Sequence, residues 1–266
     1  MWIHTLNPVL LSLGPLEIRW YGISYILGFF LTIWWMQYMR KKGELNLSKD
    51  DIWDFGFWIL VGVIIGSRLF EVFWEPSLYL SNPLNFLYIW KGGMSFHGGF
   101  VGTLVAVYFY SKKKNLNIAS VLDILSIPTI FALGLGRIAN FFNGELWGRE
   151  WIGETKGGWC VNFKNTGGGD VCRHPSTLYA AGKRFLIFGW LLFLALKNKF
   201  KPGFIALNFV LLEGLGRFIV DFYRDEKTFY FANTFTMGQI LSAIMVIVAA
   251  WLLLKHYNAE WKKILK

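Results

Sequence analysis

Residues 118–142 read IASVLDILSIPTIFALGLGRIANFF, a run in which only Asp123 and Arg137 carry a charge. A helix needs about 20 mostly apolar residues to cross the hydrocarbon core of a bilayer. We therefore expect this run to be a membrane-spanning helix. Six further runs have the same character, and they cover residues 20–39, 53–73, 96–110, 177–196, 203–223 and 237–255. The sequence predicts an all-α, polytopic integral membrane protein with seven transmembrane helices, built as a single membrane-embedded domain over residues 1–266.

The composition excludes most other classes of protein. Of the 266 residues, 55% are apolar, 19% are aromatic and 17% are charged, whereas soluble domains carry roughly 25% charged residues. A soluble globule, a disordered chain and a disulfide-built miniprotein are therefore poor fits. The net charge of +10 does not require a nucleic-acid partner, because cationic loops also anchor helices against anionic lipid headgroups.

The distribution of Lys and Arg predicts the orientation of the helices. Dense clusters follow alternate runs, at 40–42, 112–114, 197–201 and 255–263, and the intervening loops carry fewer such residues. Because cytoplasmic loops are enriched in Lys and Arg, these clusters should face the cytoplasm. The N-terminus is then outside, the C-terminus is cytoplasmic, and a long extracytoplasmic loop covers about 144–176.

Polar residues gather at the outer ends of the runs. A charge within a span costs roughly 2.5–3.5 kcal/mol on insertion scales, so this grouping predicts a hydrated cavity open to the outer side. The inner halves are nearly uncharged, with Asp123 as the main exception. The grouped residues are Tyr21, Gly22, Arg68, Glu71, His97, Gly98, Gly99, Arg137, Asn140, Asn143, Glu145, Lys183, Arg184, Glu213, Arg217 and Asp221.

Two arginines on different helices are the strongest signal of function. Arg137, Asn140 and Glu145 share one helical stripe, and Glu213, Arg217 and Asp221 recur at i, i+4 and i+8. The second set is also explained by an intrahelical salt-bridge ladder. Two guanidinium groups facing one cavity, however, match a phosphate better than a structural role.

Three further features keep alternative interpretations open. His97 lies beside Gly98 and Gly99 at a span mouth, so it is a candidate base; the two glycines permit either a close ligand or close helix packing. Cys160 and Cys172 lie in the outer loop, where a disulfide, two free thiols or a metal pair with His174 are the alternatives. We expect no cofactor, and we find no convincing ligand set for a metal.

The motifs resemble those of one family. GRIANFFNGELWGR at 136–149 closely resembles the signature of bacterial prolipoprotein diacylglyceryl transferases. WYG at 20–22, FHGG at 96–99, RHPSTLY at 173–179 and GRFIVDFYR at 216–224 are similar to other motifs of that family, in the same order. The resemblance covers the chain from near residue 8 to near residue 255.

The resemblance implies a reaction and a set of residues. Family members transfer the diacylglyceryl group of phosphatidylglycerol to the lipobox cysteine of a preprolipoprotein, which forms a thioether and releases glycerol phosphate. The implied functional positions are Tyr21, His97, Arg137, Asn140, Glu145, Gly148, Arg217 and Asp221. Three positions depart from the family pattern, because Ala180 and Asp221 each replace a Glu and Glu213 replaces a Tyr. Glu213 should weaken the binding of an anionic headgroup unless it is protonated or turned away.

These residues suggest a mechanism as a hypothesis. His97 is the preferred base for the incoming thiol, with Glu145 and Asp221 as rivals. Arg137 and Arg217 would hold the phosphate and stabilise the charge of the leaving group. Asn140 and Tyr21 would add neutral hydrogen bonds, and Gly98, Gly99, Asn143 and Gly148 would complete the substrate site. The expected setting is the cell membrane, with the active site facing the outer leaflet.

Three alternatives belong to other classes of function. An anion transporter predicts a polar path to both faces, which the apolar inner halves do not offer. A noncatalytic lipid- or peptide-binding protein predicts tolerance of conservative changes at His97 and both arginines. A related lipid transferase with a different donor is suggested by Glu213 and Ala180.

Overall fold

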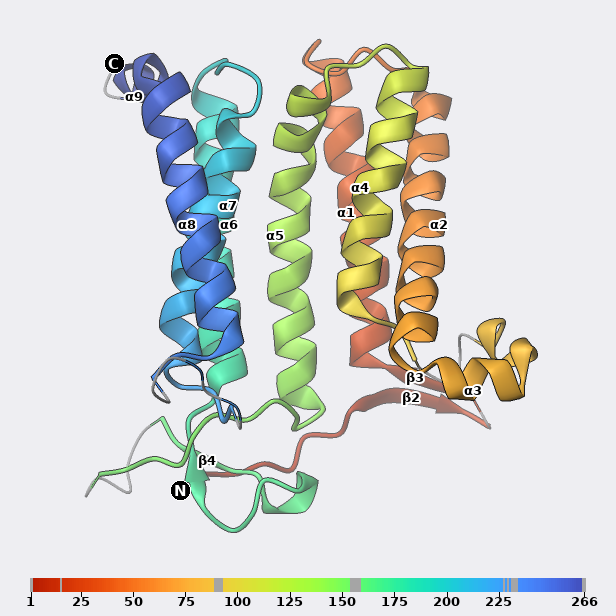
Figure 1. The fold of residues 1–266 in the computed structure, drawn as a ribbon, viewed down its shortest axis with the longest axis vertical. Coiled ribbons are helices and arrows are strands. Elements are labelled where there is room, and N and C mark those ends of the chain that lie inside the picture. The colour runs from red at the N-terminus through yellow and green to blue at the C-terminus, as the bar shows by residue number, and fades with distance from the viewer. Residues whose placement is uncertain are drawn as a thin grey trace. The chain divides into compact units, whose positions relative to one another are not determined.

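The computed structural model describes residues 2–14, 16–88, 93–153, 159–226, 228, 230 and 234–264, and it is mainly helical (Figure 1). Each of the seven predicted runs overlaps one long helix. These helices are α1 (Trp20–Lys41), α2 (Lys49–Trp74), α4 (Phe96–Lys113), α5 (Ile118–Phe142), α6 (Ser176–Lys197), α7 (Phe204–Asp221) and α8 (Met237–His256). Shorter helical segments are α3 (Pro76–Ser81), η1 (Pro83–Phe86), η3 (Lys164–Thr166) and α9 (Asn258–Ile264).

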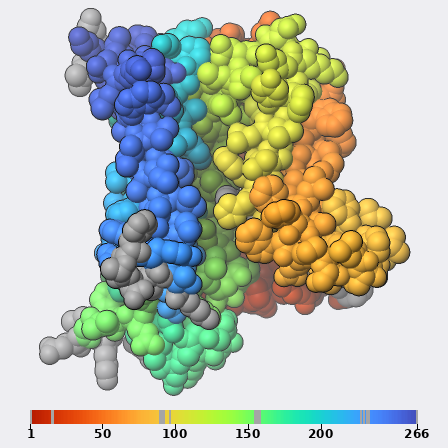
Figure 2. Space-filling view, viewed as in Figure 1, coloured from red at the N-terminus to blue at the C-terminus, as the bar shows by residue number. Residues whose placement is uncertain are grey.

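Four of the long helices are long and apolar enough to cross a membrane by length and composition, namely α2, α5, α6 and α8. Helix α8 shows this most directly, because it lies open along much of the face drawn in Figure 2 and exposes large apolar side chains. Among them, Ile247, Trp251 and Leu254 each expose more than half of their surface. Such side chains are stable against lipid rather than water.

Two small sheets correct the expectation of a purely helical chain. One contains β1 (Trp2–Ile3), β4 (Val161–Asn162) and β5 (Cys172–Arg173); the other is the hairpin of β2 (Val9–Leu13) and β3 (Leu16–Arg19). All five strands lie outside the apolar runs. The pairing of β1 with β4 joins segments far apart in the sequence, so no local periodicity predicts it.

The chain divides into two compact units, residues Met1–Leu31 with Asp123–Lys266 and residues Thr32–Leu122. In the first unit α7 packs between α6 and α8 (Figure 1). Asp123 of α5 is the main charged exception in the apolar inner halves of the runs. It accepts hydrogen bonds from the backbone N–H groups of Gly203 and Ala206, both at 2.7 Å. It therefore caps the N-terminus of α7, where unpaired backbone donors favour an anion.

In the second unit α2 and α4 pack closely through glycine. A Cβ on Gly98 would collide with the carbonyl oxygen of Gly66, and a Cβ on Gly102 would collide with that of Gly62. A Cβ on Gly99 would lie 2.7 Å from the Oγ of Ser67. Small residues at a helix crossing let two backbones approach each other, so this packing accounts for the glycines that follow His97.

Candidate active site

Arg137 of α5 and Arg217 of α7 line the same pocket in the first unit. The pocket lies between side chains from α5, α6 and α7 and from the loop that follows α5. Its other lining residues are Leu146, Ser176, Thr177, Ala180, Lys183, Arg184, Val220 and Arg224. The arrangement concentrates cationic side chains around one small space, which suits an anionic group.

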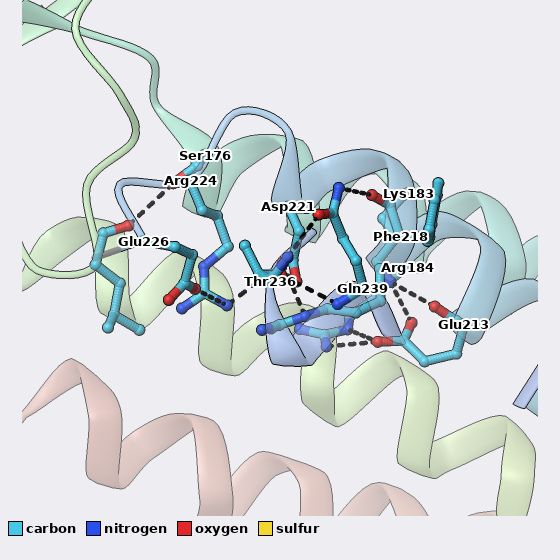
Figure 3. A network of polar contacts seen from close by, with 12 residues as sticks. Ser176, Lys183, Arg184, Glu213, Phe218, Asp221, Arg224, Glu226, Thr236 and Gln239 are labelled. Atoms are coloured by element: carbon cyan, nitrogen blue, oxygen red, sulfur yellow. Dashed lines mark hydrogen bonds and ion pairs between the residues drawn. The ribbon is translucent and has the colours of Figure 1, made fainter. Parts of the chain in front are cut away.

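Asp221 is the centre of a polar network on one side of this pocket (Figure 3). Its side chain has no exposed surface, and its Oδ1 accepts from Arg217 Nε at 2.9 Å and from Arg224 Nη1 at 3.4 Å. Thr236 Oγ1 donates to Oδ2 at 3.4 Å. Gly238 keeps this arrangement open, because a Cβ there would collide with Asp221 Oδ2. Asp221 thus orients two guanidinium groups beside the pocket.

Thr236 and Gln239 fix the start of α8 next to that network. Thr236 accepts from the backbone N–H of Gln239 at 3.1 Å, and Gln239 Oε1 accepts from the backbone N–H of Thr236 at 3.0 Å. This reciprocal capping box satisfies two of the donors that a helix N-terminus leaves unpaired. The cap therefore holds Thr236 rigidly against Asp221.

Glu213 pairs across helices rather than along its own helix. Its Oε1 accepts from Arg184 Nη2 at 2.6 Å, and its Oε2 lies 2.7 Å from Lys183 Nζ (Figure 3). Of the expected Glu213–Arg217–Asp221 ladder, only the Arg217–Asp221 pair is present as an ion pair among the described residues. Glu213 is therefore already neutralised by α6, so the competition with an anionic headgroup that the sequence suggests is removed.

Arg137 belongs to a second chain of hydrogen bonds. Its Nη1 donates to Asn140 Oδ1 at 3.2 Å, and Asn140 Nδ2 donates to Glu145 Oε1 at 2.8 Å. Asn143 Nδ2 donates to the same carboxylate oxygen at 3.0 Å. Glu145 is not on the helix, since α5 ends at Phe142 and the positive φ of 65° at Gly144 reverses the chain. The helical stripe expected to include Glu145 is therefore replaced by a turn that folds Glu145 back onto Asn140.

The charges around Arg137 and Arg217 differ. Arg217 is paired with Asp221, whereas no carboxylate among the described residues lies within ion-pair distance of Arg137. A partly buried guanidinium without a counter-charge is stabilised more by an anionic ligand than one that already has an ion-pair partner. Arg137 is therefore the stronger candidate for direct contact with a phosphate.

The loop after α5 is attached to the C-terminal end of α7 through Gly148 and Arg149. Gly148 N–H donates to His174 O, and Arg149 N–H donates to Tyr223 O, both at 2.9 Å. A Cβ on Gly148 would collide with Tyr223 O. The structure thus gives Gly148 a close backbone approach that only glycine permits, and this contact positions the loop beside Arg224.

A disulfide and an arginine stabilise the rest of that loop, of which residues 154–158 lie outside the described part of the chain. Cys160 and Cys172 are joined by a disulfide with a Cα–Cα distance of 5.4 Å. Arg173, the next residue, donates to Gly148 O at 3.1 Å and to Asp225 Oδ2 at 2.9 Å. Through these contacts the disulfide-closed loop holds Gly148 near the end of α7.

His97, Gly98 and Gly99 lie in the other compact unit, in the first turn of α4. The His97 side chain is exposed, while both glycines are buried against α2. The two glycines thus have a packing explanation, and His97 remains an accessible imidazole at a helix start. The exposed side chain of Tyr21 shares a hydrogen bond of 2.9 Å with Tyr25, its neighbour one turn along α1, through their hydroxyl groups.

The sequence places Lys183 and Arg184 in the outer polar group but gives them no role in the site, and both line the pocket. Three further lining residues, Arg224, Ser176 and Thr177, were not singled out from the sequence. Arg224 stands three residues after Asp221, a spacing that could have indicated their ion pair. The partner of Lys183 and Arg184 depends on how α6 packs against α7, and nothing local in the sequence encodes that.

His174 packs within the loop against Trp151 and Tyr179. Its ring centroid lies 4.5 Å from that of Trp151 with the two planes tilted by 39°, and its Nδ1 lies 3.2 Å from the hydroxyl of Tyr179. Burial holds the pKa of His174 below its ordinary value of 6.5, because an apolar environment disfavours the charged imidazolium. Within the described residues no group of three or more His, Cys, Asp or Glu side chains could hold a metal ion.

The fold and the pocket together define a class: a helical integral membrane protein with a cationic, anion-accepting pocket among its helices. A model of the family described as prolipoprotein diacylglyceryl transferase matches residues 8–255. The chain belongs to that family.

Individual relatives are similar to this chain over nearly its full length. The phosphatidylglycerol–prolipoprotein diacylglyceryl transferase of Photobacterium profundum is 37% identical over 261 residues, which cover 97% of this chain and 96% of the relative. The protein of the same name from Janthinobacterium is 38% identical over 271 residues, covering 98% and 99%. That from Brucella anthropi is 35% identical over 259 residues, covering 92% and 90%.

Proposed function

We propose that this chain is an enzyme that transfers the diacylglyceryl group of phosphatidylglycerol to the thiol of a cysteine in a prolipoprotein. The family and the names of its full-length relatives support this activity. The observation that carries the proposal at the level of residues is the pocket that Arg137 and Arg217 line together. Neither transport nor noncatalytic lipid binding is favoured, since the relatives are named as transferases.

The reaction is a displacement at carbon. The cysteine sulfur of the lipobox forms a bond to the glycerol carbon of the lipid that bears the phosphate, and the carbon–oxygen bond to that phosphate breaks. The electron pair leaves with the oxygen as glycerol phosphate, and the product is a thioether. Because a free thiol has a pKa of about 8.5, its proton passes to a base as the sulfur attacks. The enzyme needs no nucleophile of its own.

Arg137 and Arg217 are the groups that stabilise the leaving phosphate. Negative charge grows on its ester oxygen in the transition state, and guanidinium donors that are already held in place stabilise that charge with little reorganisation. Arg137 contacts the phosphate directly, and Asp221 keeps the Arg217 side chain in place. Asn140 links Arg137 to Glu145, and Asn143 fixes the same carboxylate.

The remaining candidate residues complete the substrate site. Tyr21 adds a neutral hydroxyl donor, and Gly148 keeps the loop backbone close to the end of α7. Gly98 and Gly99 hold the start of α4 against α2, which fixes the position of the neighbouring His97.

The base is His97, with Glu145 as its rival. Asp221 is a weaker candidate than either, because its carboxylate is fully buried and receives Arg217, Arg224 and Thr236. Glu145 is exposed, and among the described residues its Oε2 accepts no hydrogen bond. His97 is also exposed, and a neutral imidazole is suited to proton transfer near neutral pH.

The membrane setting that we propose has seven spans, an external N-terminus and a cytoplasmic C-terminus. The whole chain, residues 1–266, then acts as one membrane-embedded transferase domain, and the loop at 144–176 lies outside the cell membrane. The site faces the outer leaflet, where the lipid phosphate and an exported lipobox both arrive by lateral diffusion. The disulfide between Cys160 and Cys172 supports an oxidising environment for that loop.

Reconstitution tests the activity directly. Purified protein in vesicles of phosphatidylglycerol with deuterated acyl chains is incubated with a synthetic lipobox peptide, and the peptide is analysed by mass spectrometry. The expected result is a gain equal to one labelled diacylglyceryl group on the cysteine. Unmodified peptide, or a label taken equally from phosphatidylethanolamine in matched vesicles, contradicts the proposed donor.

A further inference from the structure

The wall of the pocket formed by α6 and α7 contains a three-residue charge cluster, Lys183, Arg184 and Glu213. Arg184 Nε and Nη2 both donate to Glu213 Oε1, at 3.1 and 2.6 Å, and Arg184 Nη1 donates to Leu133 O at 3.3 Å. These bonds use three of the five N–H donors of Arg184 and pair its charge with Glu213. One cation is therefore enough to neutralise Glu213. The second cation, Lys183, gives the cluster one net positive charge.

Lys183 is held at the pocket with donor capacity remaining. Its Nζ contacts Glu213 twice, at 2.7 Å through Oε2 and at 3.2 Å through the backbone carbonyl. An ammonium group has three N–H donors, and no other described residue accepts from Lys183. Its side chain is only 14% exposed and lines the pocket together with Arg137 and Arg217. A mostly buried excess charge is costly unless an anion compensates it.

Gly216 allows Lys183 to reach this position. A Cβ on Gly216 would lie 2.6 Å from Lys183 Cδ and 3.3 Å from its Nζ. The lysine stem therefore crosses α7 directly over this glycine, one residue before Arg217. Because of this crossing, its ammonium lies close to the turn of α7 that carries Arg217, rather than pointing away from it.

From this geometry we infer that Lys183 is a further substrate-binding residue, which donates its remaining N–H to the phosphate of the lipid donor. The inference rests on the proposed function. Glu213 is the positioning residue that keeps the ammonium in place, and Arg184 balances the charge of Glu213. The cluster thus adds a third cation to the contacts made by Arg137 and Arg217, and the same contact binds glycerol phosphate after the reaction.

Kinetics of the Lys183→Gln variant provide the first test. A hydrogen bond between charged groups is worth enough to raise the KM for phosphatidylglycerol roughly ten- to hundredfold when it is lost. Inhibition by added glycerol phosphate should weaken by a similar factor, while the KM for the lipobox peptide stays unchanged. The matched control is Lys197→Gln, which removes an exposed lysine at the far end of the same helix.

Two more variants separate substrate binding from a purely structural role. The double variant Lys183→Gln/Glu213→Gln leaves the net charge of the pocket unchanged, so a KM that returns to the wild-type value would overturn the inference. Gly216→Ala displaces only the flexible lysine stem. It should raise the KM for the donor without lowering the melting temperature, and unchanged kinetics in both Gly216→Ala and Lys183→Gln would also overturn it. A wild-type protein that fails to transfer from phosphatidylglycerol instead refutes the proposed function.

Discussion

Gly238→Ala is the sharpest probe of the Asp221 network, because it adds one carbon and removes no charge. Gly238 lies in the first turn of α8, where a Cβ would collide with Asp221 Oδ2 and lie 3.1 Å from Arg217 Nη2. Asp221 is fully buried and paired with two arginines. Its carboxylate cannot move into water, so the whole ion-pair network must shift to accept the methyl group.

The magnitude follows from two opposing effects. Alanine in place of a helical glycine stabilises a helix by roughly 0.5–1 kcal/mol, whereas an extra methyl group in a tight site costs about 1–3 kcal/mol. The net result should be a loss of about 1 kcal/mol. Activity should suffer more, because displacing a catalytic group by about 1 Å can reduce the rate roughly a hundredfold.

The measurement combines thermal unfolding in detergent with the kcat/KM of transfer from labelled phosphatidylglycerol. Gly189→Ala on α6 is the matched control, because a Cβ there meets no atom within 4 Å. That variant should be as stable and as active as the wild type, or slightly more stable. If Gly238→Ala also transfers at the wild-type rate, the packing of α8 against Asp221 and Arg217 does not control the reaction.

Four other outcomes are expected. Arg137→Ala should abolish transfer, seen by mass spectrometry of the peptide, while the protein still inserts into membranes. His97→Asn should lower transfer or shift the pH–rate profile, and an unchanged profile would remove His97 as the base. Replacing both Cys160 and Cys172 by Ser should cost about 2–4 kcal/mol of stability, measured by unfolding with and without reductant. Burial lowers the pKa of His174 below 6.5, so on acidification the unfolded chain protonates this imidazole before the folded protein does. The melting temperature should therefore fall as the pH drops below 6.5. His174→Gln should remove this fall.

The long helices are predictable from the sequence because one local property determines them. The run at 118–142 coincides with α5, and the run at 203–223 contains α7, which covers Phe204–Asp221. Continuous apolar side chains with few charges define such helices whatever their neighbours are. The strands have no such local signal, since β1 and β4 are two residues long and each depends on a distant partner.

The candidate site is predictable only where its contacts are local. The Arg217–Asp221 ion pair follows from an i, i+4 spacing on one helix. The partners of Glu213 come from α6, and the position of Glu145 depends on the left-handed turn at Gly144. Those two features arise from helix packing and loop geometry, so a helical-wheel argument assigns Glu213 and Glu145 to the wrong neighbours.

The pairing of the two acids on α7 leaves positive charge in the pocket for the anion that we propose it binds. Asp221 is shared between Arg217 and Arg224, and Glu213 is shared between Lys183 and Arg184. Each acid therefore meets two cations, and neither forms an ion pair with Arg137. The acids fix the geometry of the cationic groups without cancelling their charge. In the proposed reaction, an anionic phosphate entering this space would meet donors that are already oriented, which favours electrostatic stabilisation of a leaving group.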